Sequence, residues 1–115
     1  MQKTSLADLA EQHLAAARTA SGGRSAHTVV GGHAATLRQT LIALAGGQRL
    51  DEHESPGEAT LHVLRGRVRL VAGEDSADAS TGELLVIPDA RHRLDAVQDS
   101  VVLLTVAVGS APVPD

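Results

Sequence analysis

The sequence predicts an all-β fold, an antiparallel barrel or sandwich preceded by one short helix. Between residues 36 and 108, short runs of β-prone residues alternate with turn residues every 8 to 12 positions or so, a spacing typical of sandwiches and closed barrels. No run there is long and periodic enough for a crossover helix, which disfavours a parallel α/β sheet. At 115 residues, the chain suits a single domain with one core.

The first predicted element is a helix within residues 1–20. Its apolar residues recur at helical spacing and define one face, made of Leu6, Leu9, Ala10, Leu14 and Ala17. Ser5 followed by Asp8 resembles a capping box, which satisfies backbone N–H groups of the first turn. The glycines at 22 and 23 end the helix.

The segment 21–35 is rich in Gly, Ser and His, which indicates a linker or an extended lead-in strand. We therefore divide the chain into an N-terminal helix and lead-in segment (1–35), a barrel (36–110) and a C-terminal tail (111–115). The barrel strands are predicted over 36–45, 48–53, 59–64, 67–72, 83–87, 91–96 and 100–108, with only a short, weak stretch between 72 and 83.

The last predicted strand is apolar on both faces, since residues 101–108 carry almost no polar side chain. One face can fill the barrel. The other needs cover, either from the N-terminal helix or from a second copy of the chain. The second alternative predicts a homodimer.

Composition excludes several classes of function. The chain has no Phe, Tyr or Trp, so its core must be built from Leu, Val, Ile and Ala, and it offers no aromatic platform for stacking bases. The net charge of -4 disfavours nucleic-acid binding. Without cysteine there is no disulfide or thiol nucleophile. No apolar run spans a membrane and the N-terminus does not resemble a signal peptide, so we expect a cytoplasmic protein.

Two segments opened by glycine each carry a histidine. In the first, Gly47 is followed after five residues by His53. In the second, Gly82 is followed after five residues by a proline, and His92 comes four positions later. The two histidines belong to different predicted hairpins, which a closed barrel would bring together.

Over residues 36–108, this spacing of glycine, proline and histidine resembles the two motifs of the small single-domain cupins of the cupin 2 conserved barrel type. The resemblance implies an antiparallel jelly-roll β-barrel in which three histidines and a glutamate hold a divalent metal. His53 and His92 match two of the histidine positions. Ser55 stands at the third histidine position and Ala59 at the glutamate position, so the metal-binding motif is degenerate.

Glu58 is the candidate for a third metal ligand. With His53 and His92 it would form a two-histidine, one-carboxylate set, which suits Fe(II) with open positions. Side chains alternate along a strand, so Glu58 faces outward if Ala59 faces inward, unless a bulge at the preceding Pro-Gly turn redirects it. The implied cofactor is one divalent ion (Fe, Mn, Ni or Zn), and a site without metal is an equal alternative.

The pocket of the barrel is expected to include Ser55, Ala59, Leu61, Arg38 and Gln39. Arg38 and Gln39 interrupt an apolar run, so one of the two must face the interior or a partner subunit. A buried Arg needs a carboxylate or a ligand as its partner. His62 alternates with Leu61 and is expected to face away from the pocket.

The remaining arginines of the barrel indicate a solvated surface. Arg65, Arg67 and Arg69 share one face of a hairpin, where acidic side chains such as Glu83 are expected to pair with them. Two further arginines flank His92 and point outward if that histidine points inward.

Three functions are compatible with these residues. The preferred one is a small-molecule-binding or sensing barrel with a lost or weakened metal site, because Ser55 and Ala59 are what loss of a metal would leave. The alternative is a metal-dependent cupin enzyme of the oxygenase, isomerase or lyase type, supported by the retained His53 and His92. A purely structural domain is the third. The ligand is a small molecule in the first two, and its identity is not encoded in these motifs.

Overall fold

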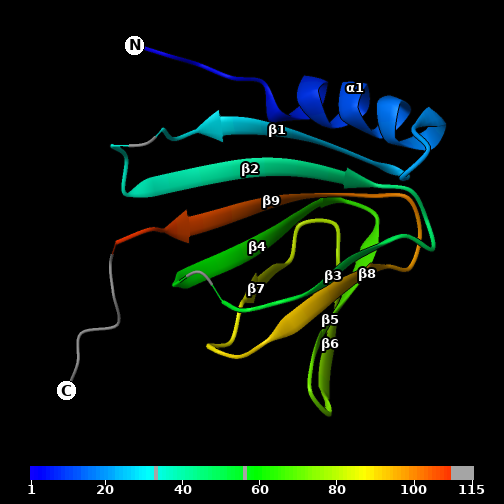
Figure 1. Ribbon diagram of the computed structural model, residues 1–115. Helices are drawn as coiled ribbons and strands as arrows, with labels where there is room; N and C mark the ends of the chain where they lie inside the picture. The colour runs from blue at the N-terminus through cyan, green and yellow to red at the C-terminus, as the bar shows by residue number, and fades with distance from the viewer. Residues whose placement is uncertain (33, 56, 110–115) are drawn as a thin grey trace.

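The computed structural model describes residues 1–32, 34–55 and 57–109. Two antiparallel β-sheets pack face to face, and one helix lies on the outer side of the first sheet (Figure 1). The elements are α1 (Leu6–Thr19), β1 (Arg24–Val30), β2 (Leu37–Leu44), β3 (Arg49–His53), β4 (Glu58–Arg65), β5 (Arg67–Ala72), β6 (Asp75–Ser80), β7 (Leu84–Val86), β8 (His92–Ala96) and β9 (Ser100–Ala107).

The first sheet has the strand order β1-β2-β9-β4-β7 and the second has the order β3-β8-β5-β6. Every strand pair is antiparallel. The predicted all-β jelly roll with a short N-terminal helix is therefore confirmed. The weak stretch between 72 and 83 contains a regular edge strand, β6. It pairs with β5 without a register shift, from Arg67 to Ala72 of β5.

The inner faces of both sheets form one aliphatic core. Its buried side chains are Ile42, Leu44, Ala59, Leu61, Val63, Val68, Leu70, Ala79, Ile87, Leu94, Ala96, Val102 and Val106. Alternation along the strands explains this set, since Ala59, Leu61 and Val63 of β4 are buried and the residues between them are less so. The core is closed without a single aromatic ring of Phe, Tyr or Trp.

Helix α1 begins at a regular cap, where the Ser5 side chain accepts a hydrogen bond from the backbone N–H of Asp8. Its buried face packs on the outer face of the first sheet, in a second cluster of Ala10, Leu14, Ala17, Leu41, Ala43, Val101 and Leu103. At the edge of this interface, the rings of His13 and His27 lie 5.4 Å apart, and the Nδ1 atom of His13 is 2.7 Å from the Ser25 hydroxyl.

The helix covers β2 and β9, so the outer apolar face of β9 finds its cover within the chain (Figure 1). It leaves other apolar side chains of the same sheet exposed, with Leu37 48%, Leu84 58% and Val86 77% accessible. The homodimer stays a prediction, and this uncovered part of the first sheet is where we expect it to form. Among the described residues, no helix is long and apolar enough to cross a membrane.

The first sheet begins in the segment that we assigned to the lead-in. Residues 24–30 form an edge strand that pairs with β2, with an irregularity between Thr28 and Val30. The strand alternative therefore describes this segment better than the linker alternative, and the sheet starts at Arg24 rather than at residue 36. The tail over 111–115 lies outside the described residues.

The backbone requires a glycine at Gly66, in the turn between β4 and β5. Its φ angle is +85°, and a side chain there would collide with the Asp99 carbonyl oxygen and with Ser100. The buried Ser100 hydroxyl in turn bridges this turn, since it accepts from the Arg67 N–H at 3.0 Å and lies 2.7 Å from the Gln98 carbonyl oxygen. This glycine therefore lets the β4–β5 turn pack directly on the start of β9.

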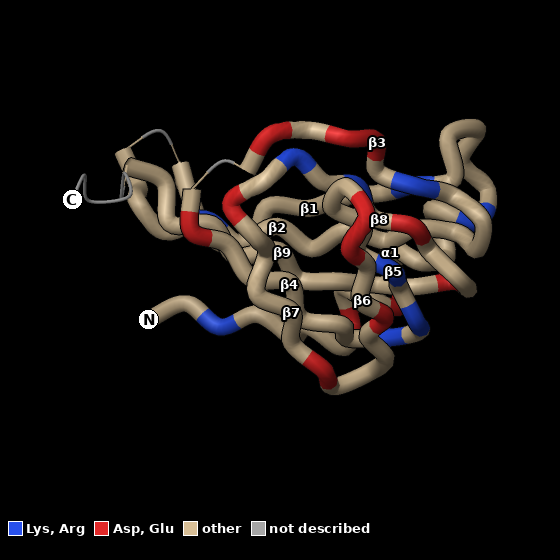
Figure 2. Tube along the Cα trace, turned by 90° about the horizontal axis from the view of Figure 1, so that it is seen from below, with Lys and Arg blue, Asp and Glu red and all other residues tan. Residues whose placement is uncertain are grey.

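The outer face of the second sheet is charged. Arg49, Asp95, Arg69 and Asp78 stand in register on β3, β8, β5 and β6, so the signs alternate across all four strands. The Arg69 guanidinium donates to Asp78 at 2.7 Å, and Arg67 does so at 2.7 Å. Figure 2 shows charged positions of both signs along these strands. These hydrogen bonds lower the pKa of Asp78 to about 2.

Candidate ligand-binding site

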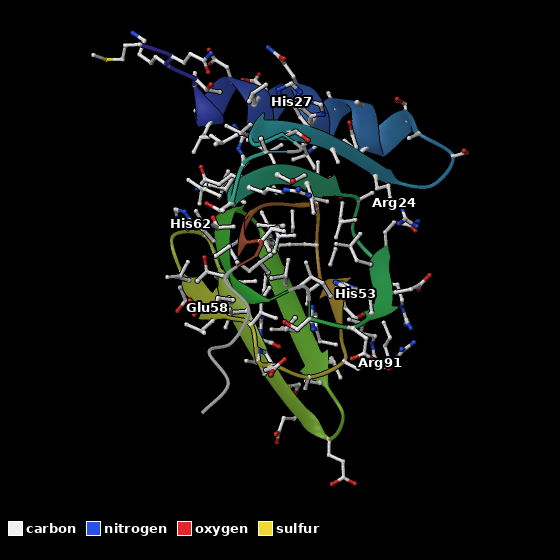
Figure 3. The ribbon with its side chains drawn as sticks, turned by 60° about the vertical axis from the view of Figure 1, so that its left-hand side comes forward. Arg24, His27, His53, Glu58, His62 and Arg91 are labelled. Carbon is white, nitrogen blue, oxygen red and sulfur yellow. The ribbon has the colours of Figure 1, made fainter. Side chains whose placement is uncertain are left out.

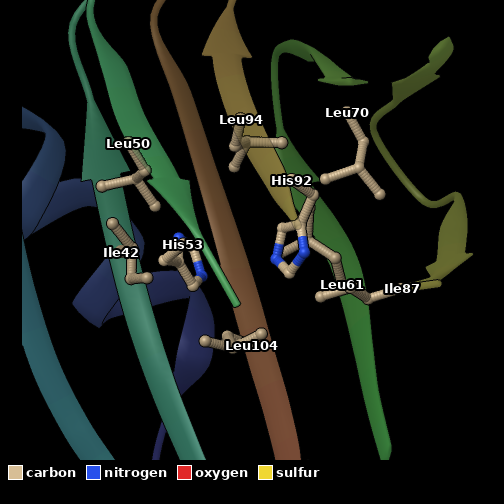
Figure 4. A pocket seen from close by; sticks show the side chains of 9 residues that line it. All are labelled: Ile42, Leu50, His53, Leu61, Leu70, Ile87, His92, Leu94 and Leu104. Atoms are coloured by element: carbon tan, nitrogen blue, oxygen red, sulfur yellow. The ribbon is translucent and has the colours of Figure 1, made fainter. Parts of the chain in front are cut away.

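Two histidines meet inside the barrel. His53 ends β3, His92 begins β8, and the two residues are direct partners across the strands after an irregularity that follows Leu50. Their ring centres are 4.5 Å apart, with the ring planes inclined at 62° (Figure 4). The fold thus brings the two histidines that the sequence pattern singled out into contact.

The same local hydrogen bond fixes both rings. The Nδ1 atom of His53 is 3.0 Å from the Asp51 carbonyl oxygen, and that of His92 is 2.9 Å from the Ala90 carbonyl oxygen. Because a carbonyl oxygen only accepts, each Nδ1 must carry the proton and donate it. In the neutral rings the lone pair is therefore on Nε2, where it is available to a ligand.

The two histidines differ in exposure. The His92 side chain is buried, with 3% of the residue accessible, whereas His53 is exposed. His92 therefore forms part of the pocket wall and His53 lies at its open side. A ligand that entered would pass His53 first and reach His92 afterwards.

The pocket around the pair is aliphatic. Its lining residues are Ile42, Leu50, His53, Leu61, Leu70, Ile87, His92, Leu94 and Leu104, and Figure 4 shows their side chains converging from both sheets. The space open to the centres of water molecules is about 30 Å³, enough for about two waters or a few ligand atoms. The two imidazoles supply the polar atoms of this lining.

The structure distributes the other predicted pocket residues differently. Leu61 lines the pocket, as expected. Ala59 faces inward but is packed in the aliphatic core, and the Ser55 hydroxyl donates to the Gly57 carbonyl oxygen at 3.0 Å. Neither Ala59 nor Ser55 is part of the lining described above, because a small side chain and a local turn hydrogen bond keep both away from the imidazoles.

Gln39 and Arg38 face opposite sides of β2. The Gln39 amide donates to the Thr105 hydroxyl at 3.1 Å, on the same outer face as the helix-covered Leu41. Arg38 alternates with it and therefore faces the interior, like Ile42 of the pocket. Of the two, Arg38 is therefore the one that faces inward, and neither Arg38 nor Gln39 belongs to the lining described above.

The geometry gives no support to the prediction of Glu58 as a third metal ligand. Glu58 is exposed at the start of β4, while the next residue, Ala59, is buried, so strand alternation holds without a bulge. Figure 3 shows Glu58 and His53 well apart. Among the described residues, no three His, Cys, Asp or Glu side chains form a group that could hold a metal ion.

The residues therefore do not fit the metal site that the cupin resemblance implies. Two imidazoles with correctly placed Nε2 atoms are present, but structural and catalytic metal sites in proteins generally need at least three protein ligands. The positions that would supply the others hold Ser55 and Ala59, and aliphatic side chains surround the pair.

Sequence reasoning missed most of the pocket wall. The missed residues are Ile42, Leu50, Leu70, Ile87, Leu94 and Leu104. A signal existed for Leu94, which lies two positions after His92 on the same strand face. For Leu50 it did not, because the irregularity before His53 changes the alternation of β3.

Comparison with known proteins supports the fold. No protein-family model and no curated protein sequence matches the chain. Solved structures do match. A conserved protein of unknown function from Streptococcus pyogenes is 27% identical with a TM-score of 0.70, and the match covers 80% of each chain. An RmlC-like cupin protein from Desulfovibrio desulfuricans is 28% identical with a TM-score of 0.64, over 73% of this chain and 81% of that one.

A more distant match has the same architecture. The salicylate 1,2-dioxygenase from Pseudoaminobacter salicylatoxidans is 17% identical with a TM-score of 0.72, and the match covers 87% of this chain but 32% of that one. Fold and matches together place the chain among the double-sheet jelly rolls. Within that class it has the fold of the small cupins, which several of the matched structures are.

Proposed function

We propose that this cupin binds a small molecule in its barrel through the His53–His92 pair, without a resident metal. The observation that carries the proposal is the pair itself. Both Nδ1–H groups are engaged by backbone carbonyls, so two Nε2 acceptors remain in a pocket whose other walls are aliphatic. A few placed polar atoms in an apolar pocket are the usual composition of a small-ligand site.

This chemistry limits the ligand. Neutral Nε2 atoms accept hydrogen bonds, so the ligand should carry a hydroxyl or N–H donor. The leucines around them favour an apolar portion next to that donor. Because the space between the lining side chains is only about 30 Å³, the part of the ligand that enters it should be only a few heavy atoms, and a larger ligand would extend past the exposed His53.

The metal content of the purified protein tests the first half of the proposal. Protein prepared without an affinity tag should contain less than ~0.1 transition metal per chain, and metal titration should give no tight binding, because two imidazoles make a weak site. Nearly one metal per chain, lost in both His53→Ala and His92→Ala, would overturn the metal-free proposal.

Ligand-dependent stabilisation tests the second half. A panel of small alcohols, amides and carboxylates, screened with a chelator present, should include compounds that raise the unfolding midpoint. Far-ultraviolet circular dichroism suits the measurement, since the chain has no Trp or Tyr. The shift should vanish in His92→Ala and persist in His62→Ala, whose histidine alternates with the inward Leu61. Equal shifts in both variants would contradict binding at the pair.

One observation favours the alternative, a metal-dependent cupin enzyme. Metal-binding histidines usually donate their other ring N–H to a carbonyl or carboxylate, which is the hydrogen bond that His53 and His92 both make. In that case a substrate or water molecules would have to complete the ligand set. The metal analysis above separates the two functions.

A further inference from the structure

Arg38 stands on the inner face of the barrel, next to the pocket. It pairs with Val106 of β9, which pairs with Ala59 of β4, so the three residues form one inward-facing row. The next inward row contains Leu104 and Leu61, which both line the pocket. Rows on one strand face are about 7 Å apart, a distance that the long arginine side chain can cover.

One donor of the Arg38 guanidinium, its Nε–H, has no partner among the described residues. This Nε atom is buried. Such donors are rare in folded proteins, because an unsatisfied buried N–H loses its hydrogen bond to water without replacement. The backbone makes room for this side chain, since a Cβ atom at Gly31 would lie 3.1 Å from the Arg38 Cγ.

In the part of the chain that the structure describes, no ion pair joins Arg38 to an acidic side chain. The pocket lining contains no Asp or Glu. Glu58, which precedes Ala59 on β4, is exposed. Ala59 occupies the same inward row as Arg38 and carries no functional group. Among the described residues, a cationic group without a counter-ion therefore stands one inward row away from the aliphatic pocket.

We infer that the ligand of this barrel is a small aliphatic carboxylate whose head group pairs with Arg38. This inference rests on the proposed function and names the class of its ligand. A guanidinium binds a carboxylate through two parallel N–H···O hydrogen bonds, which would satisfy the buried Nε–H. The aliphatic tail would lie among Leu61, Leu104 and their neighbours, and a hydroxyl on the tail could donate to a histidine Nε2.

Calorimetric titration with sodium butyrate tests the inference, with 1-butanol as the neutral probe and sodium chloride as the salt control. Wild type should bind butyrate, and 1-butanol at least tenfold more weakly. Arg38→Met should weaken butyrate binding by about tenfold or more, the loss expected for a charged hydrogen bond. Methionine preserves the length of the apolar stem. The matched control is Arg65→Met, an exposed arginine at the end of β4, which should bind butyrate like wild type.

Stability without ligand gives a second readout. Because Arg38→Met removes an unsatisfied buried donor, its unfolding midpoint in carboxylate-free buffer should equal or exceed that of wild type. A clear decrease would mean that the guanidinium already has a structural partner, and would overturn the inference.

Other outcomes separate this inference from the proposed function. Butyrate binding that is lost in His92→Ala but unchanged in Arg38→Met would overturn the carboxylate assignment and keep the pocket as a binding site. The same holds if 1-butanol binds as tightly as butyrate. Butyrate binding that neither variant changes, or no binding at ~10 mM butyrate, overturns the inference, while the ligand panel decides the proposed function independently.

Discussion

The outer faces of the two sheets differ in how their side chains meet water. On the first sheet, Leu41 and Val101 are fully buried because α1 lies over them. On the second sheet, the equivalent surface has no helix, and its side chains are a row of alternating charges, such as Arg69 and Asp78. The central part of one face is removed from water by a helix, and the other face carries charged side chains that stay in contact with water.

The difference shows where the stability of the molecule lies. Burial of aliphatic side chains stabilises a fold in proportion to the apolar area removed from water, so the helix interface should matter for folding. Exposed ion pairs contribute little on average, because water screens them and ordering their side chains costs entropy. The charged face should therefore tolerate changes that the covered face does not.

The largest effect is expected under the helix. Leu41→Ala removes a fully buried side chain and leaves a cavity between β2 and α1, which should lower the free energy of unfolding by about 2–5 kcal/mol. Leu37→Ala is the matched control, on the same strand and the same face but 48% exposed, and should change it by less than about 0.5 kcal/mol. Urea unfolding followed by circular dichroism measures both, and equal effects would mean that the helix does not protect this face.

A smaller effect is expected at the start of the helix. Ser5→Ala removes the side-chain acceptor for the Asp8 backbone N–H and should cost about 1 kcal/mol. Thr4→Ala, one residue earlier and exposed, is the control and should be close to neutral. If Ser5→Ala were as mild as Thr4→Ala, the docked face alone would hold α1 in place.

The smallest effect is expected on the charged face. Its hydrogen bonds with Arg69 and Arg67 lower the pKa of Asp78 from 3.8 to about 2, so its ionised form favours the folded state. That contribution is present above about pH 4 and is lost as the pH falls towards 2. Asp78→Asn should therefore be slightly less stable than wild type at pH 7, and the difference should disappear near pH 2.

Ionic strength provides the control for this last variant. Added salt should reduce the difference between Asp78→Asn and wild type at pH 7, because the groups involved are near the surface. A difference that is independent of both pH and salt would point to packing rather than charge, and would weaken the contrast between the two faces.

The fold could be predicted from the sequence because the positions of glycine and other turn residues determine where each strand ends. Turn residues such as Gly66 and Gly82 mark the ends of strands, and both have the positive φ angles that such turns require. The same spacing of turn residues predicted that His53 and His92 would lie close together. Strand alternation predicted that the Glu58 side chain faces outward, and a bulge would have turned it inward. The side chain is exposed, as alternation predicted.

The remaining features depend on which strands become neighbours, which local patterns do not encode. Arg67 and Arg69 were expected to pair with acids such as Glu83, but both use Asp78 across the β5–β6 pair, and Glu83 accepts from the Ser80 backbone. Likewise, the pocket wall combines residues from strands far apart in sequence, so only the closed barrel defines it.

The lack of Phe, Tyr and Trp also has a spectroscopic consequence. The six imidazoles are the only aromatic rings of the chain, so its aromatic proton NMR spectrum consists of histidine signals alone. His53 and His92 report on the pocket, His13 and His27 on the helix interface, and His62 on the outer face of β4. An unlabelled sample therefore offers separate reporters for ligand entry, helix docking and self-association, and a single pH series can follow all three.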